Sequence, residues 1–203
     1  MSAEPENSGR ERLIMLSDGV FAIAVTLLAL DLRLPEEAMR SGHIFAALAD
    51  NWERGLSFAI SFWVIAIFWR ANVRSFQWIE RVDAPFVMLT LLLLMAVSFL
   101  PFPTSVLGQT MRGAEATIFY LVSLAVASAI QLASWVYAMR IGRLLRPDTP
   151  RDVTSAIVWR GIIPLGTFVV AIALAAAGAG GNSFYVLFAI PVVPRLMRMA
   201  GRA

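Results

Sequence analysis

The residues best placed for chemistry are Ser17 and Asp18, inside the first apolar run of the chain, in the sequence LSDG. A serine nucleophile needs an adjacent base such as histidine or lysine. The chain has no lysine, and its single histidine, His43, is expected to be a solvated residue of a connecting segment. No cysteine is present, which excludes a disulfide framework and a cysteine-based metal site. We therefore predict a protein that is not an enzyme, with no metal and no cofactor.

An aspartate inside a membrane span needs a partner, because it costs about 2.5–3.5 kcal/mol at the centre of a helix. Arg12 stands six residues before Asp18, too far around a helix for a good local pair. It could reach Asp18 from a neighbouring subunit or across a bend at Gly19. The alternative is that Ser17 and Asp18 lie at the membrane surface and are solvated.

An apolar stripe follows these polar residues. Ile23, Leu27 and Leu30 recur at i, i+4 and i+7, and Thr26 lies beside them. Ordinary helix packing is the simplest interpretation of such a stripe. The periodicity alone does not separate packing from a functional surface.

These residues belong to a chain whose composition is that of a membrane protein. Of the 203 residues, 59% are hydrophobic and only 15% are charged, against about a quarter in soluble domains. A helical span needs roughly 20 apolar residues. Six runs qualify, over about 13–34, 56–76, 84–102, 116–138, 157–177 and 183–199. They are too long and too continuously apolar for barrel strands. We expect an all-α membrane protein, with residues 1–203 forming one domain in the lipid bilayer and Pro101 and Pro103 marking the exit of the third span.

The arginines predict the orientation of the chain. Thirteen of the 17 lie before the first run, at or beside the connection between runs two and three, at or beside the connection between runs four and five, or near the C-terminus. Cytoplasmic connections carry an excess of basic residues, so both termini are expected in the cytoplasm. The arginines lie in the gaps between apolar runs or near the ends of the runs, and they form no patch for nucleic acid.

The first span also resembles a known family. LSDGVFAIAVTLLALDL, with Arg12 upstream, is similar to the arginine plus FSDGVFAIxxTLLxLxL signature of the transmembrane protein 175 family, which comprises endo-lysosomal potassium channels and bacterial relatives. FWRANVRSFQWIERVD, which begins at Phe68, and LPFPTS, which begins at Leu100, resemble the ends of the second and third helices of that family. The likeness covers the first hundred residues, and the last three spans match in hydropathy only.

The resemblance implies a subunit of six transmembrane helices in a homotetramer of the plasma membrane, with helix one lining a central pore. It implies a passive channel for monovalent cations that prefers potassium modestly over sodium and has no TVGYG filter. By matching position, the constriction consists of Ile23, Leu27 and Leu30, with Thr26 beside them. A polar network that holds helix one is implied for Arg12, Ser17, Asp18 and Trp69. We add Asp31, at the outer mouth, as a residue that attracts cations.

Two departures from the family pattern affect these expectations. Leu16 stands where the family usually has phenylalanine. Asn72 and Val73 stand where bacterial relatives usually carry a histidine pair, so Asn72 is the candidate to complete the network. This removes a basis for pH sensitivity at that position.

Two other functions remain open. One is a secondary transporter, but the first span has no proline, and the later spans lack the acids that would couple transport to protons or sodium. The other is a proton leak through the same pore.

Overall fold

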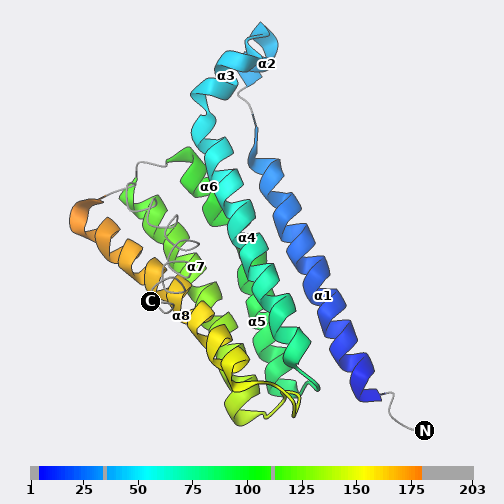
Figure 1. Cartoon of the computed structure of the whole chain (residues 1–203). Helices are drawn as coiled ribbons and strands as arrows, with labels where there is room; N and C mark the ends of the chain where they lie inside the picture. The colour runs from blue at the N-terminus through cyan, green and yellow to red at the C-terminus, as the bar shows by residue number, and fades with distance from the viewer. Residues whose placement is uncertain (1–4, 34–35, 111–112, 180–203) are drawn as a thin grey trace, which may run out of the picture.

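The computed structural model describes residues 5–33, 36–110 and 113–179, and most of these residues are helical. The long helices run side by side as one bundle (Figure 1). They are α1 (Pro5–Leu27, continued by the 3-10 turn Leu28–Asp31), α4 (Trp52–Trp78), α5 (Ala84–Phe99), α6 (Pro101–Gln109), α7 (Ala114–Val136, continued by the π-helical turn Tyr137–Ile141) and α8 (Arg151–Leu174, continued by the π-helical turn Ala175–Ala179). Within the described ranges, β-pairing is limited to one isolated bridge between Ile79 and Leu145.

Five segments of the described chain are long and apolar enough to cross a membrane. They are Ser8–Leu30, Trp52–Trp78, Ala84–Gln109, Ala114–Ile141 and Arg151–Gly178. They overlap the first five predicted runs, so the all-α membrane fold is confirmed for this part of the protein. The sixth predicted run, 183–199, lies outside the described residues.

The predicted end of the third span is wrong. Pro101 and Pro103 do not end it, because α6 continues to Gln109 almost in line with α5. Proline is tolerated in the first turn of a helix, where its missing N–H has no partner to lose. Leu100 keeps helical dihedral angles, and the N–H of Thr104 bonds to its carbonyl at 3.1 Å. The prolines therefore interrupt the hydrogen-bond ladder without turning the chain.

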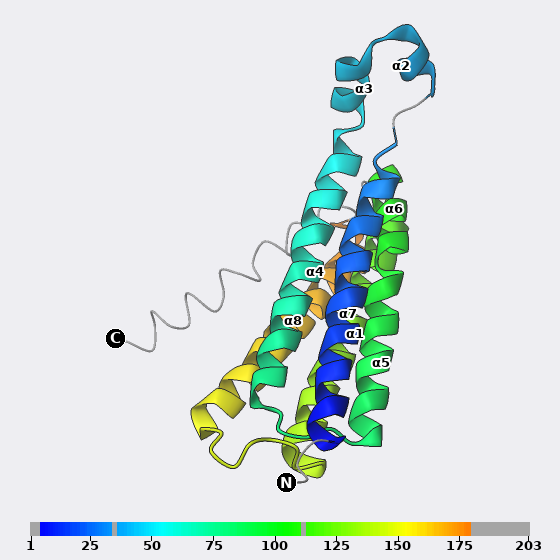
Figure 2. The ribbon, with the colours of Figure 1, turned by 90° about the vertical axis from the view of Figure 1, so that its right-hand side faces the viewer.

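The connection between α1 and α4 contains two short helices that the hydropathy pattern did not predict. These are α2 (Glu36–Ser41) and α3 (Ile44–Asp50), and they extend beyond the end of the bundle (Figure 2). Helices of six and seven residues are too short to show an apolar period. His43 precedes α3 and is exposed, as expected.

Two apolar clusters of buried residues hold the long helices together. Helix α1 packs against α4 and α5, and α7 packs against α5, α6 and α8. In the larger cluster the residues of α1 are Phe21, Ala24 and Leu28, and Leu13 belongs to the smaller one. The larger cluster of buried residues also includes Ile65, Phe68, Leu93, Val97, Leu107, Leu121 and Phe168. One face of α1 is therefore fixed by the rest of its own subunit.

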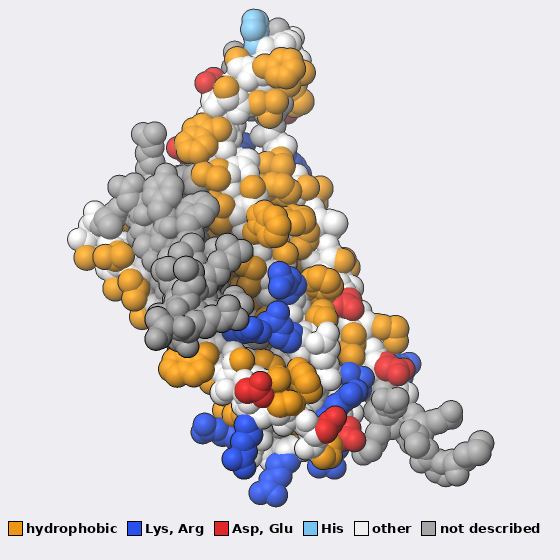
Figure 3. Space-filling model, in the orientation of Figure 1, with side chains coloured by type: hydrophobic (Ala, Val, Ile, Leu, Met, Phe, Trp, Pro, Cys, Tyr) orange, Lys and Arg blue, Asp and Glu red, His pale blue; other side chains and the backbone are white. Residues whose placement is uncertain are grey.

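The arginine-rich connections lie together at the end of the bundle where α1 begins (Figure 1). The α4–α5 and α7–α8 connections are joined by backbone hydrogen bonds, from the N–H of Glu80 to the carbonyl of Leu144 at 2.9 Å and from Arg146 to Trp78 at 3.0 Å. Arg10 joins α1 to the same end by donating to the carbonyl of Phe76 at 2.7 Å. Figure 3 shows basic side chains gathered there. The arginine pattern predicted that the N-terminus and these two connections lie on the same side of the membrane, and the structure places them at the same end of the bundle.

Candidate functional site

The predicted stripe of α1 lies on a face that its own subunit leaves open. Ile23 is 60% exposed, Leu27 39% and Leu30 61%, whereas Phe21, Ala24 and Leu28 on the packed face are at most 2% exposed. Both sets are apolar and both follow helical spacing. The difference is that α4 and α5 cover one face of α1 and not the other. The open face is free to meet other helices or lipid.

Thr26 lies beside this stripe and is exposed. Its hydroxyl donates to the carbonyl of Ile23 at 2.8 Å, within the same helix. The hydroxyl proton is thus used, and the lone pairs of the oxygen remain on the open face. A polar group is therefore available among apolar side chains without an unpaired donor.

The outer end of α1 is closed by arginines that the sequence reasoning did not connect with it. The Arg33 side chain donates to the carbonyl of Leu30 at 3.2 Å, and Arg54 of α4 donates to the carbonyl of Arg33 at 3.0 Å. The first bond satisfies a carbonyl that the helix end leaves unpaired, and the second joins α4 to the residue just past that end. Asp31 ends the 3-10 turn, and its side chain lies outside the described residues. The two arginines place positive charge at this end of α1.

Asp18 and Trp69 are brought together as the resemblance implied. The indole Nε1–H of Trp69, on α4, donates to Asp18 Oδ1 at 2.8 Å. The two residues are 51 positions apart in sequence. This bond joins α1 to α4 two to three helical turns from Leu27. It gives the carboxylate of Asp18 a donor from a second helix.

The other residues of the predicted network lie elsewhere. Ser17 is fully buried and donates to the carbonyl of Leu13 in its own helix, at 2.8 Å. Arg12 is exposed and makes no hydrogen bond or ion pair within the described part of the subunit. Asn72 is 6% exposed and lines a small cavity between α4, α5 and α7, together with Thr90 and Ser134. Helix α1 runs unbroken through Gly19, so no bend brings Arg12 to Asp18.

A buried group of hydroxyls was missed by the sequence reasoning. Ser61 Oγ of α4 lies 2.9 Å from both Tyr120 OH of α7 and Thr104 Oγ1 of α6. All three residues are at most 3% exposed. The spacing of Ser57 and Ser61, four residues apart in an apolar run, was the available signal, since it puts two hydroxyls on one helix face. The bonds tie together the three helices behind α1.

No three histidine, cysteine, aspartate or glutamate side chains are grouped so as to hold a metal ion in the described ranges. The open face of α1 presents the apolar side chains of Ile23, Leu27 and Leu30 with the hydroxyl of Thr26 beside them.

Comparison with known proteins connects this arrangement to a family. The family model described as endosomal/lysosomal potassium channel TMEM175 matches residues 12–101. A potassium channel of Streptomyces collinus is 38% identical over 146 residues, which are 68% of this chain and 70% of the relative. A potassium channel of Chamaesiphon minutus is 33% identical over 178 residues, with 86% and 88% of the two chains covered.

A solved structure has the same fold. It is a lysosomal potassium-selective channel TMEM175 homolog from Chamaesiphon minutus, which superposes with a TM-score of 0.80 at 28% identity over 94% of this chain and 98% of the other. The human endosomal/lysosomal proton channel TMEM175 is 25% identical over 190 residues, 92% of this chain but only 36% of the human protein. The resemblance detected in the first hundred residues is confirmed, and the likeness extends beyond them.

Proposed function

Since this chain belongs to the TMEM175 family of endosomal and lysosomal potassium channels, we propose that it conducts potassium passively, with a modest preference over sodium, through a pore lined by α1. In this proposal four subunits surround the pore, each with six transmembrane helices. The constriction consists of Ile23, Leu27 and Leu30, with Thr26 beside them. The bacterial relatives that support the proposal are named potassium channels.

The observation that carries the proposal is the open apolar face of α1. Rings of apolar side chains can gate a pore by dewetting. An ion that crosses such a ring must shed part of its hydration shell, and potassium holds water less tightly than sodium. A preference for potassium then needs no ring of backbone carbonyls. Selectivity of this origin is expected to be modest.

The remaining predicted residues have roles that support the pore-lining helix α1. The Trp69–Asp18 bond at 2.8 Å holds α1 against α4, so that the stripe keeps its orientation. Ser17 is proposed to fix α1 in the subunit, and Asn72 to support α4 from its far side. Arg12 is proposed to act between subunits, because within its own subunit it is exposed and unbonded in the described residues. Asp31 is proposed to attract cations, with Arg33 and Arg54 limiting that effect.

The location follows from charge. We place the protein in the plasma membrane with both termini in the cytoplasm, because the arginine-rich connections gather at the end where α1 begins (Figure 3).

A flux assay tests the proposal. Protein reconstituted in liposomes with a potassium gradient should pass current that reverses near the potassium equilibrium potential. Leu27→Ser should raise flux and move the reversal potential toward that of sodium, because a polar side chain lowers the cost of wetting the constriction. Leu91→Ser is the matched control, since Leu91 is a leucine of α5 that is also 39% exposed. Unchanged flux and selectivity in Leu27→Ser would contradict the pore assignment.

Proton conduction is the second candidate, and the vertebrate relatives favour it. The bovine, human and zebrafish proteins are named proton channels, although this chain matches only 32%, 36% and 24% of their lengths. A pH-sensitive dye inside the same liposomes separates the two. Acidification that depends on Leu27 in the absence of potassium would favour the proton pathway.

A further inference from the structure

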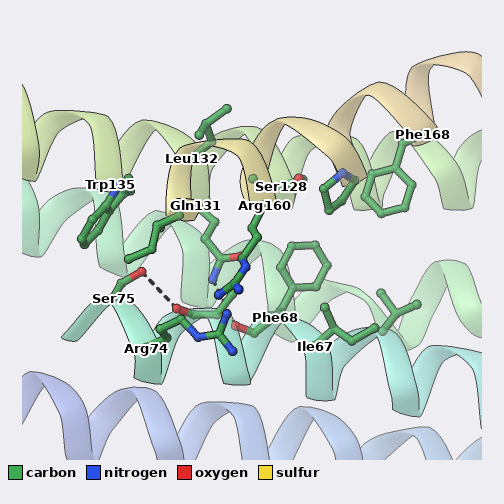
Figure 4. A pocket seen from close by; sticks show the side chains of 15 residues that line it. Ile67, Phe68, Arg74, Ser75, Ser128, Gln131, Leu132, Trp135, Arg160 and Phe168 are labelled. Carbon is green, nitrogen blue, oxygen red and sulfur yellow. Dashed lines mark hydrogen bonds between the residues drawn. The ribbon is translucent and has the colours of Figure 1, made fainter. Parts of the chain in front are cut away.

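A cleft between α4, α7 and α8 combines positive charge with apolar walls. It has a volume of roughly 90 Å³, and its lining includes Arg74 from α4, Gln131 and Trp135 from α7, and Arg160 from α8. Figure 4 shows the Arg74, Gln131 and Arg160 side chains pointing toward one another across it. Gln131 is held in place by donating to the carbonyl of Phe68 at 3.0 Å.

The charges of the cleft are not balanced by the protein. Its lining residues include no aspartate or glutamate. Arg74 is repelled by Arg160 and also by Arg70, one turn away on α4. In the described residues, the guanidinium groups of Arg74 and Arg160 form no ion pair. Like charges in an apolar setting are unfavourable without a counter-ion, so this arrangement calls for an anion.

A second observation points to a missing hydrogen-bond acceptor. Trp135 is 2% exposed, and its Nε1–H is buried with no partner in the described part of the chain. A buried donor is nearly always paired. The Trp135 ring lines this cleft as well as the smaller cavity beside Asn72, so an acceptor bound in the cleft would lie near the ring.

Along the helix axes, the cleft is polar near the arginine-rich end of the bundle and apolar farther from it. At about 1.5 Å per residue, Arg74 lies roughly 6 Å from the end of α4, and Arg160 roughly 13 Å from the start of α8. The apolar lining residues Val64 and Phe168 lie roughly 21 Å and 25 Å from those ends. Figure 4 shows Phe168 and Ile67 at one side and Arg74 and Ser75 at the other. This order, polar near the membrane surface and apolar toward its centre, matches a phospholipid.

We propose that this cleft binds an anionic phospholipid from the leaflet at the arginine-rich end of the bundle. The headgroup phosphate accepts from Arg74 and Arg160, since guanidinium groups fit phosphate oxygens in pairs. An acyl chain runs along Ile67 and Phe168 toward the membrane centre. Basic pockets between transmembrane helices on the cytoplasmic side are a known form of lipid recognition.

A segment of the same chain is a poorer occupant. Residues 180–203 contain no aspartate or glutamate and carry three arginines, Arg195, Arg198 and Arg202. Packing that segment over the cleft would add positive charge instead of neutralising it. The site also does not depend on ion conduction, so it can be tested by binding alone.

Native mass spectrometry of the delipidated full-length protein tests the proposal. Dioleoyl phosphatidylglycerol should bind at least about tenfold more tightly than dioleoyl phosphatidylcholine, because one charge-assisted contact accounts for about that factor. Arg74→Gln combined with Arg160→Gln should abolish this preference. Arg160→Gln alone should reduce the preference for phosphatidylglycerol. Because Arg160 is exposed, this single variant is expected to fold even if the double variant does not.

The matched control is Arg81→Gln combined with Arg146→Gln, which removes the same charge from exposed positions of the two connections at the same end. This variant should keep the preference. Equal loss in both double variants would overturn the proposal in favour of nonspecific surface charge. Inorganic phosphate alone should not compete at millimolar concentration, and competition by it would overturn a lipid site in favour of a free-anion site.

Discussion

Leu27 and Leu28 are adjacent leucines with opposite surroundings, and they give the sharpest test of how α1 is used. Leu27 is 39% exposed on the open face, and Leu28 is 1% exposed in the core. We predict that Leu27→Ala changes ion flux and leaves the subunit stable. Leu28→Ala should destabilise the subunit and leave ion selectivity unchanged.

The magnitude follows from burial. Leucine-to-alanine changes in packed cores cost about 2–5 kcal/mol, partly from transfer out of water and partly from the cavity left behind. In a membrane, lipid tails are as apolar as leucine, so the transfer contribution is small and the packing contribution remains. We therefore expect about 2–3 kcal/mol for Leu28→Ala. For Leu27→Ala we expect less than about 1 kcal/mol, because its own subunit packs only part of the side chain.

Two measurements on the same preparations check this pair. Thermal melting in detergent, followed by size-exclusion chromatography, reports stability, and potassium and sodium flux in liposomes reports conduction. Equal destabilisation by both substitutions, with no change in flux for Leu27→Ala, would refute the reasoning. That result would mean that Leu27 packs against a helix and does not line a pore.

Two further predictions concern the bonds behind α1. Trp69→Phe removes the donor to Asp18 and should lower stability by about 1 kcal/mol. Asp18→Asn keeps an acceptor oxygen and should lower stability by less. Thermal melting measures both changes, and equal losses would argue against the bond. Ser61→Ala should lower stability by about 1–2 kcal/mol, because it removes the hydroxyl that both Tyr120 and Thr104 contact. Tyr120→Phe should lower stability by less, since the bond between Ser61 and Thr104 survives. The reverse order in urea or thermal unfolding would contradict this prediction.

The membrane spans could be read from the sequence because they depend on local composition. A run of about 20 apolar residues has to form a helix in a bilayer, where unpaired peptide groups are too costly. The first five runs are found as helices for this reason. Local reasoning failed at Pro101, since proline can begin a helix as well as end one, and only the path of the chain distinguishes the two cases.

The partners of polar residues could not be read in the same way. Trp69 is one of six tryptophans in the chain, and nothing in its local sequence says that it meets Asp18. Asn72, three residues later, was expected to join Asp18 and instead faces the cavity with Thr90 and Ser134. Residues three apart on a helix differ by only about 60° around its axis. Which neighbour each one meets therefore depends on how α1, α5 and α7 are placed around α4.

The sequence by itself determined that this is an all-helical membrane protein of the TMEM175 family, with an apolar stripe and an embedded acid in its first span. Only the tertiary structure decided that Ile23, Leu27 and Leu30 lie on the open face of α1, while Phe21, Ala24 and Leu28 face the core. The physical reason is the solvent. In water a buried face is apolar and an exposed face is polar, but in lipid both are apolar, so periodicity marks the faces of a helix without saying which one its neighbours cover.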